Sequence, residues 1–361
     1  MWDTLRTILS FIIDIAVLIY VHELGHYVAA RACGVTVEVF SIGFGPALFS
    51  RTAKSGTVWQ ISALPLGGYV KMQGWGEDDE PNAPPAEPGS FGAAPLGAKA
   101  LIVAAGPLAN LALAVVLFSG LFMTVGQMIT QPVLSQIQPN SPAAAAHLQA
   151  GDRVVKIGDT AIVDFQALQD TVAANPDRVL DFTVQRGAAT LTLPVQLGDV
   201  PEGSGKIGHL GVVGQASSFH RYAPGPAVVA ALRETGRQIS GWGQGILTLL
   251  VQHQGLSDLA GPLGIAQVTG QAAAMGLASI VGLIAVLSVN LGLVNLIPIP
   301  VLDGGHLLFY AFEAVLRRPL SANTREAGLR VGLLVIVSLM LMTTFNDLNR
   351  LGAVAWFTHL L

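Results

Sequence analysis

The chain has 361 residues, of which 52% are hydrophobic and 12% are charged, and its net charge is −4. The charged fraction is about half the ~25% of an ordinary soluble domain. The chain therefore has too little polar surface to cover itself, and a membrane protein is the leading class. The small net charge gives no indication of a nucleic-acid partner, and the single cysteine excludes a disulfide within the chain.

Four segments are apolar over lengths close to the ~20 residues that cross a bilayer. We expect spans at residues 8–30, 100–125, 280–297 and 329–345. The first span carries an acidic residue, Asp14, before it reaches His22. An acid at that depth is a functional-site candidate, and a packing partner facing the bundle interior is an equal alternative. The pattern predicts a polytopic α-helical membrane protein.

The pattern changes to short strands between the first two spans. Residues 57–62 and 68–72 have strand character on either side of a turn at Pro65-Leu66-Gly67. We therefore expect a β-hairpin in this region.

The soluble part of the chain lies between the second and third spans. Residues 133–214 alternate strand-like runs with polar turns, which predicts a compact α+β domain of about 80 residues. We divide the chain into an N-terminal membrane half (1–125), a soluble domain (126–216), an amphipathic helical connector (217–258) and a C-terminal membrane half (259–361).

Lysine and arginine predict the orientation of the spans. They gather between the first and second spans and between the third and fourth, whereas the two ends of the chain offer few. Loops rich in basic residues stay in the cytoplasm. The soluble domain is then expected on the outer side, which is the periplasm in a Gram-negative cell.

The first span ends in the sequence His22-Glu23-Leu24-Gly25-His26. Residues four apart share one face of a helix, so both imidazoles can bind one metal ion. Glu23 can reach a metal-bound water as a general base. Two histidines and a carboxylate are costly in an apolar helix unless a dication compensates them. The alternative is a pair of histidines that form hydrogen bonds within a packed bundle.

A catalytic zinc site usually needs a third protein ligand. The best candidate is Asp303, which follows the third span at the cytoplasmic end, the same side that His22 and His26 approach. The alternative for Asp303 is a turn or N-cap residue before a pair of glycines. His306 is a rival ligand, or it supports Asp303 without binding the metal.

The motifs His22-Glu23-Leu24-Gly25-His26 and Leu302-Asp303-Gly304 resemble those of the site-2 protease family of intramembrane zinc metalloproteases, and within it the regulator of sigma-E protease branch. The resemblance continues in order along most of the chain. It includes Gly43-Phe44-Gly45-Pro46, Gly67-Gly68-Tyr69-Val70-Lys71-Met72, Gly106-Pro107-Leu108-Ala109-Asn110 and Ser288-Val289-Asn290-Leu291-Gly292.

This resemblance implies a Zn²⁺ cofactor held by His22, His26 and Asp303, with Glu23 as the catalytic base. For Asn110 we expect a role in close helix packing.

The resemblance also implies sites for the substrate. Gly68, Tyr69, Val70 and Lys71 are expected in a membrane-associated β element, whose edge can pair with an extended substrate. Asn290 and Asn295 are implied to hold the unwound substrate backbone, and hydrogen bonding between helices is the alternative.

The soluble domain resembles a PDZ domain. The resemblance is carried by Pro139-Asn140-Ser141-Pro142-Ala143-Ala144 and by Leu148-Gln149-Ala150-Gly151-Asp152-Arg153-Val154. His147 stands where that family often has glycine, which hints at a modified turn. The length admits one such domain, whereas the best-known relatives of the branch have two. The resemblance implies a size filter or a peptide docking site, and a passive spacer is the alternative.

These observations predict a multi-pass zinc endopeptidase of the bacterial inner membrane. Its partners would be the lipid bilayer and single-span membrane substrates, such as anti-sigma factors or remnant signal peptides. One alternative is a non-catalytic adaptor with a structural metal, although such a site needs no general base. A metal transporter is a further alternative, but no second chain of ionisable residues crosses the bilayer. The sequence does not indicate an oligomeric state.

Overall fold

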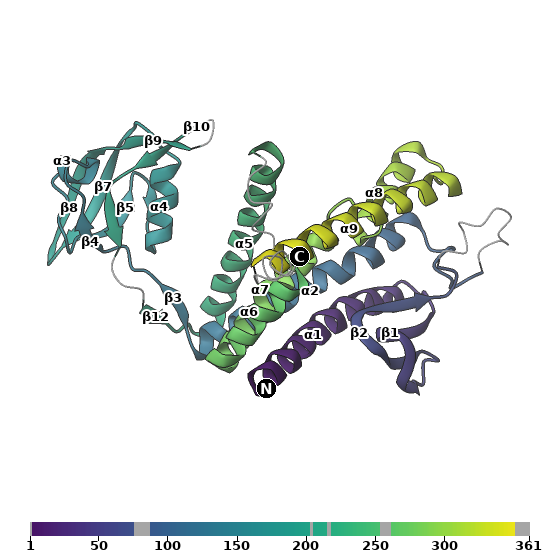
Figure 1. Ribbon diagram of the computed structural model, residues 1–361. Helices are drawn as coiled ribbons and strands as arrows, with labels where there is room; N and C mark the ends of the chain where they lie inside the picture. The colour runs from purple at the N-terminus through teal and green to yellow at the C-terminus, as the bar shows by residue number, and fades with distance from the viewer. Residues whose placement is uncertain (1, 76–86, 203–204, 215–217, 253–260, 351–361) are drawn as a thin grey trace, which may run out of the picture. The chain divides into compact units, whose positions relative to one another are not determined.

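The computed structural model describes residues 2–75, 87–202, 205–214, 218–252 and 261–350. The chain divides into a helical unit, formed by residues 1–121 and 224–361, and a smaller unit, formed by residues 122–223. The helices and strands of both units are labelled in Figure 1.

Within its described residues, the helical unit contains four helices that are long and apolar enough to cross a membrane. They are α1 (Trp2–Ala32), α2 (Leu96–Thr124), α7 (Leu277–Asn295) and α9 (Ala322–Arg350). This confirms the four expected apolar helices, although α9 is longer than residues 329–345. Three further helices are α5 (Pro224–Gln252), α6 (Pro262–Met275) and α8 (Asp303–Leu316). The last two have 14 residues each, too few to cross a bilayer.

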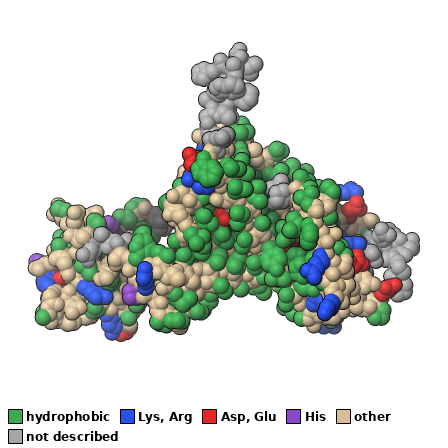
Figure 2. Space-filling model, turned by 90° about the horizontal axis from the view of Figure 1, so that it is seen from below, with side chains coloured by type: hydrophobic (Ala, Val, Ile, Leu, Met, Phe, Trp, Pro, Cys, Tyr) green, Lys and Arg blue, Asp and Glu red, His purple; other side chains and the backbone are tan. Residues whose placement is uncertain are grey.

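The exposed faces of these four long helices are largely apolar. On α1, Ile8 and Ile13 are 50% and 57% exposed, and on α9 Leu334 is 67% exposed. Figure 2 shows hydrophobic side chains over much of the surface of the helical unit. Such a large apolar surface is uncommon in a soluble protein and suits contact with lipid.

Close packing of α1 and α2 depends on small residues. A Cβ atom on Gly25 would lie 2.3 Å from the carbonyl oxygen of Ala105 and 2.8 Å from the Cβ atom of Ala109. On the other side of α2, a Cβ atom on Gly292 of α7 would lie 2.9 Å from the carbonyl oxygen of Pro107. Small residues allow helix backbones to approach closely in membranes, where no hydrophobic effect drives the helices together.

The β-hairpin between α1 and α2 consists of β1 (Val37–Thr52) and β2 (Val58–Met72). The predicted turn at Pro65-Leu66-Gly67 is wrong, because those residues continue β2 and the turn lies at residues 53–57. Both strands bend instead of ending. Gly43 and Gly67 have positive φ angles, and a Cβ atom on Gly43 would lie 2.7 Å from the carbonyl oxygen of Leu64.

The bends place the two halves of β2 on either side of β1. Residues 39–42 of β1 pair with residues 68–71 on one side and with residues 58–61 on the other. Among the described residues, no strand pairs with the second edge of 68–72. That edge remains available to an added strand.

The chain between α7 and α8 folds tightly enough to fix Asp303, the first residue of α8. A Cβ atom on Gly304 would lie 2.3 Å from the carbonyl oxygen of Ile297, and one on Gly305 would lie 2.3 Å from that of Ile299. Only glycine fits at these two positions without moving the backbone. The two glycines predicted from sequence as a turn signal therefore serve close backbone packing.

The smaller unit has a four-stranded sheet in the order β6-β5-β7-β8. These strands are β5 (Arg153–Ile157), β6 (Thr160–Ala161), β7 (Val179–Arg186) and β8 (Ala189–Gln196). The core includes Leu134, Val154, Leu168 and Phe182, each at most 1% exposed. The helices are α3 (Pro142–Ala145) and α4 (Phe165–Ala173). Three further strand pairs complete the unit: β4 (Leu134–Ile137) with β11 (Val212–Gly214), β9 (Gly198–Glu202) with β10 (Gly205–His209), and β3 (Gln127–Ile129) with β12 (Ser218–His220).

The pairing of β3 with β12 places the end of the soluble part later in the chain than we expected. We expected the connector to begin at residue 217, but residues 218–220 pair with residues 127–129 of the same unit. The unit therefore ends at Ala223, and α5 belongs to the helical unit. The end of the expected connector, at residues 253–258, lies outside the described residues.

Two features distinguish the segment 147–152 of the smaller unit, one that costs conformational energy and one that stabilises. His147 has a φ angle of 58°, the left-handed conformation that glycine would adopt more easily. The buried carboxylate of Asp152 accepts two hydrogen bonds of 2.7 Å from the guanidinium of Arg186. Burial alone would raise the pKa of Asp152, but Arg186 and the N–H group of Gln149 hold that pKa below its ordinary value.

Candidate metal and active site

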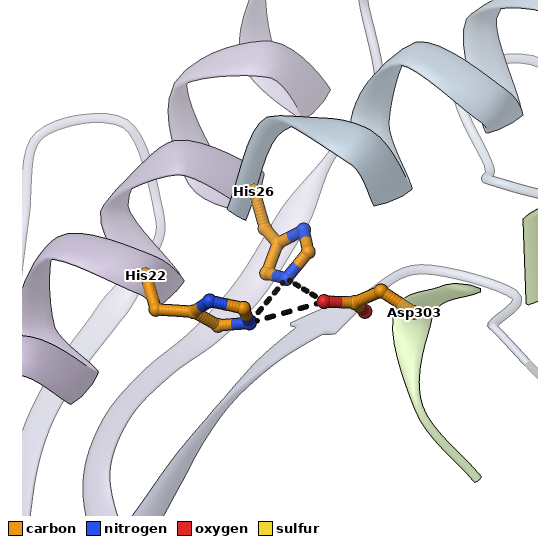
Figure 3. A group of neighbouring side chains, drawn as sticks. All are labelled: His22, His26 and Asp303. Atoms are coloured by element: carbon orange, nitrogen blue, oxygen red, sulfur yellow. Dashed lines mark hydrogen bonds and ion pairs between the residues drawn. The ribbon is translucent and has the colours of Figure 1, made fainter. Parts of the chain in front are cut away.

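His22, His26 and Asp303 form a compact cluster inside the helical unit (Figure 3). The Nε2 atoms of the two histidines are 3.1 Å apart. Asp303 Oδ2 lies 3.1 Å from Nε2 of His22 and 3.5 Å from Nε2 of His26. The structure thus brings together the motif at the end of the first span and the aspartate that follows the third.

The geometry of the cluster fits a zinc ion. Ligands about 2.05 Å from a tetrahedral zinc ion lie about 3.3 Å from one another, close to the three separations in this cluster. Asp303 Oδ2 is buried and receives no hydrogen bond from the described residues, although two imidazoles are near it. Two nitrogen donors and one carboxylate are also a ligand set typical of catalytic zinc.

The cluster lies on the wall of a cavity of about 770 Å³. Glu23, which is 9% exposed, lines this cavity together with the three residues of the cluster. His306 also lines it, and its ring contacts the edge of Trp75 with centroids 5.8 Å apart. His306 does not belong to the cluster of metal-ligating groups in the described part of the chain.

Groups on helix α2 contact the Nδ1 atoms of both histidines. Nδ1 of His26 lies 2.9 Å from the carbonyl oxygen of Ile102. The side-chain amide of Asn110 lies 3.2 Å from Nδ1 of His22. Between these two positions is Gly106, where a Cβ atom would lie 2.3 Å from Nε2 of His26. Ile102, Gly106 and Asn110 are each four residues apart and therefore share one face of α2.

We expected close helix packing at Asn110, whereas the structure places its amide against a histidine ring. The carbonyl of Ile102 was not anticipated at all, because a main-chain group leaves no signal in the sequence. The i, i+4 spacing of Gly106 and Asn110 on α2 is the sequence signal for a helix face turned towards the two histidines.

Only some of the residues predicted to bind substrate lie at the cavity. Gly68, Tyr69, Val70 and Asn295 line it, whereas Asn290 is not among the lining residues. Lys71 directs its side chain to Glu38, with 2.8 Å between Nζ and Oε2.

Strand β2 approaches the catalytic motif very closely. A Cβ atom on Gly68 would lie 2.7 Å from Cγ2 of Ile19 and 3.0 Å from Cγ of Glu23.

Asp14 does not belong to the site. It is 1% exposed and lies two helical turns from His22 on α1. Neither of its carboxylate oxygens has a hydrogen bond within the described part of the chain.

The chain resembles curated proteases along nearly its whole length. Atu1380 of Agrobacterium fabrum, which carries the name of a zinc metalloprotease, is 39% identical, with 95% of this chain and 96% of the relative covered. Metalloprotease MmpA of Caulobacter vibrioides is 35% identical, with 95% of each chain covered. Regulator of sigma-E protease RseP of Escherichia coli K12 is 31% identical, with 97% of this chain and 99% of the relative covered.

A comparison with solved structures found the PDZ domain of the SdrC-like protein of Listeria monocytogenes. It is 16% identical, with a TM-score of 0.21, and 24% of this chain and 87% of that chain are covered. A score this low does not assign the fold of the smaller unit.

The model of peptidase family M50 matches residues 10–339. This range contains both motifs of the cluster, and the relatives are named as zinc enzymes or proteases. A non-catalytic adaptor is therefore no longer an adequate description. The chain belongs to peptidase family M50, the site-2 protease family, and is a zinc metalloprotease with multiple apolar helices.

Proposed function

We propose that this protein cleaves single-span membrane proteins within the bilayer of the bacterial inner membrane. The observation that carries the proposal is the cluster of His22, His26 and Asp303, whose two histidines are buried among helices with apolar exposed faces. A water-requiring reaction at such a place needs a cavity, and the cavity of about 770 Å³ beside the cluster supplies one.

In this proposal His22, His26 and Asp303 hold the zinc ion, and Glu23 is the catalytic base. Zinc, when bound, polarises a peptide carbonyl and makes a water molecule more acidic. Glu23 accepts the proton of the attacking water and then donates it to the leaving nitrogen. Its burial beside the two histidines keeps bulk water away from this proton transfer.

The substrate binds in extended form along β2. A peptide bond within a helix is shielded, so the substrate helix unwinds before it is attacked. The open edge at residues 68–72 can pair with the unwound segment through main-chain hydrogen bonds. Lys71 contributes its backbone to this edge while its side chain pairs with Glu38. Asn295, which lines the cavity, can bind a substrate carbonyl or N–H group, and we do not extend this role to Asn290.

The basic loops favour a cytoplasmic position for the hairpin and the loop before α9. The smaller unit is then periplasmic, and we propose that it is a PDZ-like domain that filters substrates by size or docks a peptide. Anti-sigma factors and remnant signal peptides are suitable substrates, because their outer parts are trimmed before the membrane segment is cut.

The test is a comparison of wild type with Glu23→Gln, using a purified single-span substrate and mass mapping of the products. We expect the variant to retain one zinc ion per chain and to lose cleavage, because the amide cannot accept a proton. Glu326→Gln is the matched control, since Glu326 is an exposed carboxylate that pairs with Arg330 on α9. Full cleavage by Glu23→Gln, or products cut outside the apolar segment, would contradict the proposal.

A further inference from the structure

The two imidazoles of the cluster are supported by different kinds of group. A neutral imidazole carries a proton on one ring nitrogen only, and a nitrogen that binds metal must be free of it. The Nε2 atoms face Asp303, so each Nδ1 atom must carry the proton when zinc is bound. Each Nδ1–H group then needs an acceptor.

For His26 the acceptor is fixed. The carbonyl oxygen of Ile102, 2.9 Å from Nδ1, can only accept a hydrogen bond. This main-chain group therefore selects the tautomer of His26 in which Nε2 is free to bind metal.

For His22 the neighbouring group is the side-chain amide of Asn110, whose nearest atom lies 3.2 Å from Nδ1. An amide offers an NH₂ group in one orientation and an oxygen in the other, and a half-turn of the side chain exchanges them. Only the oxygen can accept the Nδ1–H bond that zinc binding requires. With the NH₂ group in that place, the proton of His22 lies on Nε2, from which it can be donated to Asp303, 3.1 Å away.

We propose that Asn110 is a positioning residue for the metal, whose amide oxygen holds His22 in the tautomer that binds zinc. In the zinc-free protein the amide turns and its NH₂ group donates a hydrogen bond to Nδ1. Asn110 can therefore form a hydrogen bond with either tautomer of His22. This inference rests on the proposed role of His22 as a ligand. It adds a side chain from α2 to a site whose proposed ligands come from α1 and α8.

The surroundings of Asn110 argue against a role in packing alone. The residue is completely buried, and its side chain forms no hydrogen bond with any described residue except His22. The backbone carbonyl of Asn110 is bound separately by the hydroxyl of Ser288 at 2.8 Å. A buried amide with one unsatisfied atom is costly, and leucine of similar volume would pack more favourably if packing were the only requirement.

The test measures zinc affinity of the full-length protein in detergent, by competition with a chelator, with every variant placed on the Glu23→Gln background so that no cleavage occurs. Asn110→Leu removes the acceptor, and we expect zinc binding to weaken about 10- to 100-fold, as for other groups that orient metal ligands. Asn110→Asp keeps an acceptor for Nδ1–H and should restore affinity to within a few-fold of the parent. Ser288→Ala, the matched control, disturbs the same turn of α2 without touching the amide and should leave affinity unchanged.

The Asp variant keeps the test decisive even if Asn110→Leu fails to fold. Equal affinity of Asn110→Leu and its parent would overturn the inference and leave the proposed function intact. Loss of affinity in Asn110→Asp as severe as in a variant with no acceptor would also overturn it, because the role would then not be that of an acceptor. Absence of zinc from the parent protein itself would refute the ligand set and the proposed function together.

Discussion

Gly106→Ala tests how closely α2 must approach the metal ligands. The added Cβ atom would lie 2.3 Å from Nε2 of His26 and 2.5 Å from Cε1. Atoms of this kind are in favourable contact at about 3.5 Å, so the ring or the helix must move by about 1 Å. Either movement disturbs the zinc site, because Nε2 is the proposed ligand atom and Nδ1 is bound to Ile102 on the same helix.

The size of the effect follows from the cost of overpacking. Forcing extra volume into a well-packed interior typically costs about 1–3 kcal/mol. If that cost falls on the zinc-bound form, zinc affinity decreases about 5- to 150-fold, since 1.4 kcal/mol corresponds to a factor of ten. Cleavage should decrease by at least the same factor at limiting zinc, because a displaced His26 also misplaces the reaction site.

The assay combines chelator competition for zinc with cleavage of a single-span substrate. Gly120→Ala is the matched control, because it makes the same change within α2 at a position where a Cβ atom meets nothing within 4 Å. The control should retain wild-type zinc affinity and wild-type cleavage. Wild-type zinc affinity and wild-type cleavage in Gly106→Ala would refute the close approach of α2 to His26.

Three further predictions concern other parts of the protein. Gly68→Ala should lower cleavage while zinc remains bound, by about tenfold if overpacking costs about 1–3 kcal/mol. The new Cβ atom would lie 2.7 Å from Ile19, 2.8 Å from the carbonyl oxygen of Ser41 and 3.0 Å from Glu23, none of which is a proposed zinc ligand; cleavage at the wild-type rate would contradict the position of β2. Arg186→Met should destabilise the smaller unit at neutral pH, by leaving the Asp152 carboxylate buried without an opposite charge. Since the pKa of Asp152 is lowered in the folded protein, the Asp152–Arg186 pair stabilises the folded smaller unit above about pH 4. This stabilisation is lost as the pH falls through the lowered pKa. Hydrogen exchange in residues 122–223 of the whole protein should therefore show a difference between variant and wild type that shrinks in acid. Each glycine placed beside the scissile bond of a substrate should raise kcat/KM, up to about 5-fold, because glycine weakens a helix by about 1 kcal/mol; unchanged kinetics would argue against unwinding.

The parts of the fold that could be predicted from the sequence are those with a local pattern. Apolar runs of about 20 residues are sufficient to identify a span, and the four expected spans correspond to α1, α2, α7 and α9. Helices α6 and α8 were not anticipated, because 14 residues within an uncharged or mixed stretch give no signal distinct from a neighbouring span. The bends of β1 and β2 were also missed. They depend on contact between Gly43 and the distant carbonyl of Leu64, which no local pattern contains.

In the candidate site, too, the features with a local sequence pattern could be predicted, whereas those that depend on packing between helices could not. The spacing of His22 and His26 is local, and the expected orientation of the spans was enough to choose Asp303, which the structure places beside both histidines. The contact of Asn110 with His22 depends on the rotation of α2 relative to α1. That rotation depends on the close contact of Gly25 with the backbone of Ala105 and of Gly106 with the ring of His26. A hydropathy pattern contains no information about such contacts.

The open edge of β2 beside the cavity favours an extended substrate. In a helix the main-chain N–H and C=O groups are already paired with one another. The edge at residues 68–72 can form main-chain hydrogen bonds only with a segment whose groups are free. An extended segment meets this condition. The close contact of Gly68 with Glu23 then places the paired segment beside the catalytic base. In the proposed mechanism unwinding is then a condition for pairing with β2, and selection among membrane helices would rest on how easily each one unwinds.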